Sequence, residues 1–139
     1  MTIVLAIALG MIWHTLALAV GGQSATKAWS WGLLAGAIAG VAAGQFTLWS
    51  RKRLHGRESF GHVAATYYLA ILVYWFSGGM IEALLGIDGG DREPFVAYIF
   101  GLPWVLGYCT LLGVVLLPLC WVSRDLLWSF HVRIRPNKT

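Results

Sequence analysis

The stretch from Gly32 to Gly44, GLLAGAIAGVAAG, places a glycine at every fourth position. These glycines are Gly32, Gly36, Gly40 and Gly44. Residues four apart lie on one face of an α-helix, so the four glycines predict a nearly flat groove about 18 Å long. In lipid, the burial of apolar side chains between helices gains little, and close contact between backbones drives helix association instead. The stretch therefore predicts a helix-packing surface within a membrane.

The sequence leaves two occupants open for this groove. One is another helix of the same chain, and the first apolar stretch offers small residues for that contact at Ala6, Gly10 and Ala17. The last apolar stretch, with Gly107 and Gly113, offers less of a stripe. The other occupant is a second copy of the chain or a different membrane subunit.

The composition agrees with a membrane environment. Of the 139 residues, 58% are hydrophobic and 12% are charged, whereas a soluble domain usually carries about 25% charged residues. This excludes an ordinary water-soluble enzyme, and the length allows a single domain.

Four apolar segments are long enough to cross about 30 Å of hydrocarbon, which takes about 20 helical residues. They cover approximately residues 3–20, 29–49, 60–87 and 95–122, and a basic interfacial tail follows at 123–139. Unpaired backbone groups are too costly in lipid for anything but helices here. We therefore predict an all-α integral membrane four-helix bundle, with kinks at Pro103 and Pro118. The alternative for the first segment is a cleaved signal peptide, although it lacks a basic start.

The basic residues predict the orientation of the bundle. Eight of the ten lie in the second loop or the C-terminal tail: Arg51, Lys52, Arg53, Arg57, Arg124, Arg133, Arg135 and Lys138. Basic loops are retained on the cytoplasmic side, so both termini are expected in the cytoplasm, with a bacterial inner membrane as the location. Clusters at membrane exits indicate contact with anionic lipid headgroups rather than with nucleic acid. The expected headgroup contacts are Arg51, Lys52, Arg53, Arg57, Arg133 and Arg135.

Ionisable and polar residues at membrane depth are the candidate functional residues, because they are costly there. They are His14, Glu82 and Gln45. His14 and Glu82 differ in predicted depth by about 10 Å, so a direct contact between them needs strong tilt or an intervening water. The alternative is that each is satisfied separately, His14 by a hydroxyl such as that of Thr110 or Tyr108. The histidines do not share one depth, so neither haem nor any other cofactor or metal is expected.

The function predicted from these features is that of a non-catalytic membrane subunit, which packs in and stabilises a larger respiratory, photosynthetic or transport complex. Its partners are the lipid bilayer and either other subunits or copies of itself. The alternative is a small oligomeric transporter or channel whose pathway is lined by Glu82, His14 and Gln45. An enzyme is not expected, because the sequence lacks the metalloprotease, phosphate-binding and nucleophile-elbow motifs.

Overall fold

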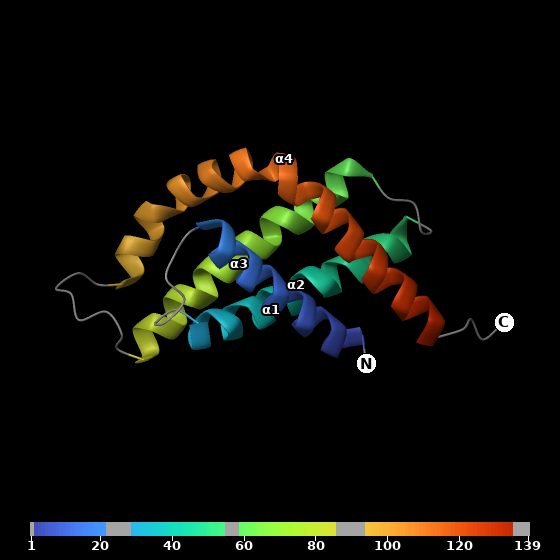
Figure 1. Cartoon of the computed structure of the whole chain (residues 1–139), viewed down its shortest axis with the longest axis horizontal. Coiled ribbons are helices and arrows are strands. Elements are labelled where there is room, and N and C mark those ends of the chain that lie inside the picture. The colour runs from blue at the N-terminus through green and yellow to red at the C-terminus, as the bar shows by residue number, and fades with distance from the viewer. Residues whose placement is uncertain (1, 22–28, 55–58, 86–93, 135–139) are drawn as a thin grey trace.

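The computed structural model describes residues 2–21, 29–54, 59–85 and 94–134 of the chain. Its regular elements are the helices α1 (Thr2–Gly21), α2 (Trp29–Arg53), α3 (Phe60–Leu85) and α4 (Pro94–Ile134), which are arranged as Figure 1 shows. The predicted all-α class is confirmed.

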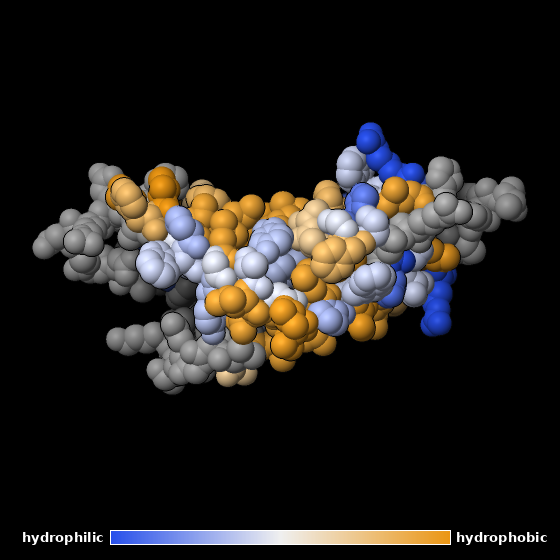
Figure 2. Space-filling model, turned by 90° about the horizontal axis from the view of Figure 1, so that it is seen from above, coloured by the Kyte–Doolittle hydropathy of each residue, from blue (hydrophilic) through white to orange (hydrophobic). Residues whose placement is uncertain are grey.

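Three of the helices contain segments long and apolar enough to cross a membrane, namely Gly32–Arg53, Phe60–Leu85 and Ile99–Ile134. Figure 2 shows apolar surface over the middle of the molecule and the most hydrophilic residues gathered at one end. These properties indicate an integral membrane protein. The apolar segment described in α1, Thr2–Leu16, is shorter, so the crossing by α1 stays a prediction.

Glycines on both helices bring α1 and α2 into backbone contact. A Cβ added at Gly36 would lie 2.8 Å from the Gly10 carbonyl oxygen, and one added at Gly40 would lie 2.9 Å from the Gly10 Cα. A Cβ at Gly44 would lie 2.8 Å from the Cβ of Ala6. These distances leave no room for side chains, so the glycine-bearing face of α2 packs on α1 of the same chain.

The contact between α3 and α4 is built from larger side chains. Val63, Tyr67 and Cys120 are buried there, and the Tyr67 hydroxyl donates a 2.7 Å hydrogen bond to the Cys109 carbonyl oxygen. Partly buried residues from three helices pack against this cluster: Trp13, Tyr68, Ile71, Cys109, Leu116 and Leu117. Because Trp13 of α1 packs against this cluster, the cluster connects the α3–α4 pair with the α1–α2 pair.

Helix α4 extends beyond the predicted membrane span of residues 95–122. It has 41 residues, corresponding to about 62 Å of helix, contains Pro103 and Pro118, and arches over the other helices in Figure 1. The predicted span ended at 122, with an interfacial tail beyond it, whereas the helix continues unbroken to Ile134. Within this continuation Arg124 and Leu127 are each 2% exposed. The hydropathy falls at Arg124, but buried residues continue on the inner face of the helix beyond it, so this part of the helix also packs against its neighbours.

The two ends of the described chain lie at the same end of the molecule (Figure 1). Thr2 Oγ1, at the start of α1, lies 3.5 Å from Nδ1 of His131 in the last turn of α4. The basic end of α2 is there too, because Arg51 pairs with Asp125 of α4. Placement of this end in the cytoplasm stays a prediction.

Candidate functional site

The four helices enclose a partly open cavity with a volume of about 270 Å³. Its walls are almost entirely apolar. Every helix contributes to it, for example through Leu9 of α1, Ala39 of α2, Ala70 of α3 and Leu116 of α4. Its volume approaches that of small-molecule sites, which begin at about 300 Å³.

His14 lies at one end of the cavity and is 2% exposed. Its Nδ1 is 2.7 Å from the Tyr74 hydroxyl, and the two rings are 5.7 Å apart between centroids. The ring fits because Gly32 has no side chain: a Cβ there would lie 2.7 Å from His14 Nε2. Within the part of the chain that the structure describes, Nε2 has no hydrogen-bond partner.

Arg124 lies in the wall at the other end and joins three helices. Its guanidinium donates hydrogen bonds to Thr66 Oγ1, to the His62 carbonyl oxygen at 3.1 Å and to Ser50 Oγ at 3.1 Å. Thr47, also in the cavity wall, donates to the Ala43 carbonyl oxygen at 2.8 Å. The charged guanidinium has hydrogen-bond donors and no acceptor. Oxygen atoms of α2 and α3 accept its hydrogen bonds and hold it between the helices.

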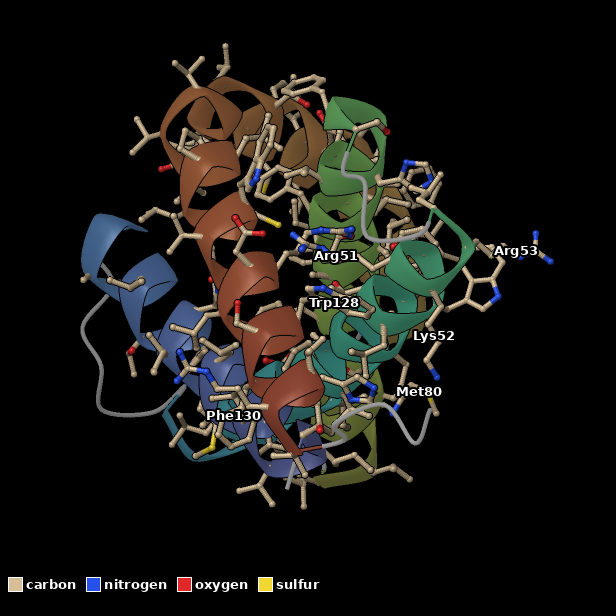
Figure 3. All side chains as sticks on the ribbon, turned by 90° about the vertical axis from the view of Figure 1, so that its right-hand side faces the viewer. Arg51, Lys52, Arg53, Met80, Trp128 and Phe130 are labelled. Atoms are coloured by element: carbon tan, nitrogen blue, oxygen red, sulfur yellow. The ribbon has the colours of Figure 1, made fainter. Side chains whose placement is uncertain are left out.

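Arg51 is 5% exposed, and it does not take the headgroup position expected from the sequence. It donates a hydrogen bond to Asp125, and its guanidinium carbon lies 5.9 Å from the centre of the Trp128 ring. Figure 3 shows Arg51 and Trp128 between α2 and α4, and Lys52 and Arg53 directed outward. The physical reason is the continuation of α4, which brings a carboxylate against the end of α2.

The other predicted headgroup residues are placed as follows. Lys52, Arg53 and Arg133 are exposed, and the Arg53 guanidinium lies 4.6 Å from the centre of the Trp49 ring. Arg57 and Arg135 lie outside the described residues.

The structure does not bring His14, Glu82 and Gln45 together in the cavity. Only His14 is among its lining residues. Gln45 is exposed and lies at a separate hollow of about 10 Å³, whereas Glu82 is half-buried on α3, two turns beyond Tyr74. The arrangement therefore provides no shared polar pathway through these three residues.

Other polar side chains pair across helices. Trp13 Nε1 donates to Ser123 Oγ at 3.2 Å, and the hydroxyls of Tyr68 and Thr110 are 2.9 Å apart. Among the described residues, no group of three or more His, Cys, Asp or Glu side chains could hold a metal ion. The two pairs connect α1 and α3, respectively, with α4.

Sequence reasoning missed Tyr74 and Arg124. For His14, one alternative from the sequence is a hydroxyl partner such as Thr110 or Tyr108, and the structure places the hydroxyl of Tyr74, on α3, beside it. Arg124 was assigned to the interfacial tail, although Cys120, Arg124 and Leu127 have the spacing of one helix face. That periodicity was the available signal for its burial.

Comparisons with known protein families, with curated proteins and with solved structures find no match for this chain.

Proposed function

We propose that the chain is a non-catalytic integral membrane subunit that packs in a larger membrane complex and stabilises it. The observation that carries this proposal is the exposed side of α4. Large apolar residues recur there at intervals of three or four: Trp104, Tyr108, Leu111, Val115, Leu119 and Val122. We call these six residues the α4 stripe, and their spacing suits the packing of another helix.

The exposure of the stripe supports a role in contact with other molecules. Trp104 is 83% exposed and Leu111 is 78% exposed. The α1–α2 pair uses its small residues internally, and among the described residues α4 has more exposed large apolar side chains than any other helix. Lipid covers such a face in an isolated chain, and a partner helix replaces that lipid in a complex.

The interior supports the same proposal over transport. His14 bonds to Tyr74, and Gln45 and Glu82 lie away from the cavity. A transported ion or polar solute requires a connected series of polar groups or waters through the bilayer. The nearly apolar cavity wall does not supply one.

We further propose that the basic end of the molecule faces the cytoplasm of a bacterial inner membrane. The exposed basic residues in the last turns of α2 and α4 at that end are Lys52, Arg53 and Arg133. Exposed basic residues there favour retention on the cytoplasmic side and attraction to anionic headgroups.

The experiment is mass measurement of the chain extracted from its native membrane in a mild detergent. We expect a particle that contains the 15.2 kDa chain together with other polypeptides in fixed ratio. Replacement of Leu111 and Val115 by serine is expected to release those polypeptides, whereas the same change at Val132, which is exposed on α4 outside the stripe, is expected to retain them.

Two results would contradict the proposal. One is a lone monomer in every mild detergent. The other is solute-dependent flux through liposomes that contain only this chain, which would favour the oligomeric transporter.

A further inference from the structure

The interior cavity has different chemistry at its two ends. Arg124, Ser123 and Thr66 line one end, and His14, Tyr74 and Trp75 line the other. On α3 the distance from Thr66 to Trp75 is nine residues, or about 14 Å of helix. The space between these ends is bordered by Ala39, Ala43, Ala70, Ile71 and Leu116. It is therefore elongated along the bundle and apolar between its ends.

An apolar space of this kind is better filled by an apolar group than by water. Water remains in a protein cavity where it finds two to four polar partners, and wholly apolar cavities stay dry. An empty cavity also deprives its wall atoms of dispersion contacts. A hydrocarbon chain, available at high concentration in the surrounding bilayer, satisfies both requirements and can enter through the open part of the cavity.

The Arg124 end of the cavity determines which headgroup the bound molecule is expected to have. Arg124 is 2% exposed, and its position is fixed by hydrogen bonds to Thr66, Ser50 and His62. A fixed guanidinium in a low-dielectric site interacts most strongly with carboxylate or phosphate oxygens. Arg124 lies near the basic end of the bundle, which is also where a lipid headgroup would be found.

We propose that this cavity binds a single-chain anionic lipid, with its hydrocarbon chain in the apolar space and its anionic head against Arg124. The volume of about 270 Å³ and the length of about 14 Å accommodate part of one hydrocarbon chain, with the remainder at the open side, and exclude the two chains of a diacyl lipid. The site belongs to the isolated chain and is present whether or not the protein assembles with other subunits.

The proposal is tested on the full chain, purified, stripped of lipid and reconstituted in liposomes of phosphatidylcholine. The probe is brominated stearate, because bromine quenches tryptophan fluorescence on contact and Trp13 and Trp75 line the cavity. Exposed tryptophans are quenched in proportion to the probe in the bilayer. We expect a second, saturable component of the quenching, which the double variant Trp13→Phe and Trp75→Phe removes.

Displacement of the brominated stearate by other single-chain compounds identifies the chemical class of the headgroup. Palmitate, hexadecyl phosphate and hexadecanol share a chain length and differ in charge. We expect palmitate or hexadecyl phosphate to displace the probe at about one-tenth of the concentration that hexadecanol requires, the gain typical of a charge-assisted hydrogen bond. Displacement by palmitate alone assigns a carboxylate, and displacement by hexadecyl phosphate alone assigns a phosphate.

Two variants with matched controls locate the site. Ala70→Phe fills the cavity and is expected to abolish the saturable component, whereas Ala65→Phe, on the exposed side of the same helix, retains it. Arg124→Gln is expected to remove the preference for anionic heads, whereas Arg133→Gln, exposed on α4, keeps it. If Arg124→Gln does not fold, the Ala70→Phe variant and the competition series decide whether the proposed lipid site exists.

The proposal is overturned by the absence of a saturable component, by equal displacement with hexadecanol and both anions, or by unchanged binding in Ala70→Phe.

Discussion

Gly36 and Gly40 are the residues at which the fold depends most directly on the lack of a side chain. A Cβ at Gly36 would lie 2.8 Å from the Gly10 carbonyl oxygen, and a Cβ at Gly40 would lie 2.9 Å from the Gly10 Cα. Both neighbours are backbone atoms and cannot rotate away. Any side chain therefore forces the α1 and α2 helices apart.

We expect Gly36→Ala and Gly40→Ala each to destabilise the protein by about 1–3 kcal/mol, the usual cost of overpacking. The loss occurs although alanine favours a helix by about 1 kcal/mol over glycine. Thermal unfolding in a mild detergent measures it. The control is Gly107→Ala, where an added Cβ meets nothing within 4 Å and the Tm should stay constant or rise. Equal Tm values for all three variants would show that the glycine face is not packed on α1.

His14 and Tyr74 form the interior polar pair at the far end of the cavity. Tyr74→Phe removes the 2.7 Å hydrogen bond to Nδ1 and leaves a buried imidazole to be satisfied otherwise. We expect a loss of about 1–3 kcal/mol in the free energy of unfolding. Tyr108→Phe is the matched change, because Tyr108 is 54% exposed, and it should have little effect. A larger loss of unfolding free energy in Tyr108→Phe than in Tyr74→Phe would contradict the hydrogen bond between His14 and Tyr74.

His14 could be identified from the sequence as a buried polar residue, because its distance along the first apolar segment places it deep in the bilayer. Its partner could not be identified. Several hydroxyls lie at compatible depths, and the choice among them depends on how α1 and α3 rotate about their axes. Arg124 was missed for a related reason, since a basic residue after an apolar segment is typical of a membrane exit.

At the scale of single elements, the starts of all four helices and the ends of α1 and α3 lie within two residues of the predicted spans, and only α2 and α4 continue well beyond theirs. Helices α2 and α3 begin at Trp29 and Phe60, where their apolar segments begin. By contrast, α2 continues to Arg53 and α4 to Ile134, beyond the predicted ends at 49 and 122. Hydropathy reports which residues suit lipid, whereas the backbone helix continues through arginine and lysine because both have good helix propensity.

The continuation of α4 is testable at Ser129, an exposed residue five positions before the end of that helix. Ser129→Pro removes a backbone donor and introduces a steric clash with the preceding turn, at a cost of about 3 kcal/mol. We expect backbone amides at 130–134 to lose protection from hydrogen exchange. Ser129→Ala should leave them protected. Unprotected amides in the unchanged protein would show that α4 ends earlier.

At the scale of the whole molecule, the helices are closely packed at the α1–α2 contact and leave a partly open cavity next to α4. Backbone contact joins α1 to α2, while the long arch of α4 meets the other helices through side chains and leaves the cavity beneath it. The glycine spacing predicts a closely packed face on α2 and leaves open whether α1 or another chain covers it. The sequence could not indicate the cavity, because a void depends on the path of α4 relative to three other helices.

The ends of the molecule also differ. Arg51 and Arg124 are buried within the bundle, and Lys52, Arg53 and Arg133 are exposed. Both termini of the described chain lie at this basic end (Figure 1). We predict an even number of membrane crossings with the basic end inside the cell, and that topology would account for this arrangement.

The most direct test of this account is cysteine labelling in intact cells, after Cys109 and Cys120 are replaced by alanine. Single cysteines are placed at Arg53, at the basic end of α2, and at Leu84, which is 82% exposed near the other end of α3. With a membrane-impermeant maleimide, we predict labelling at 84 in intact cells and at 53 only after the membrane is permeabilised. Labelling at 53 from outside the cell would contradict the predicted topology.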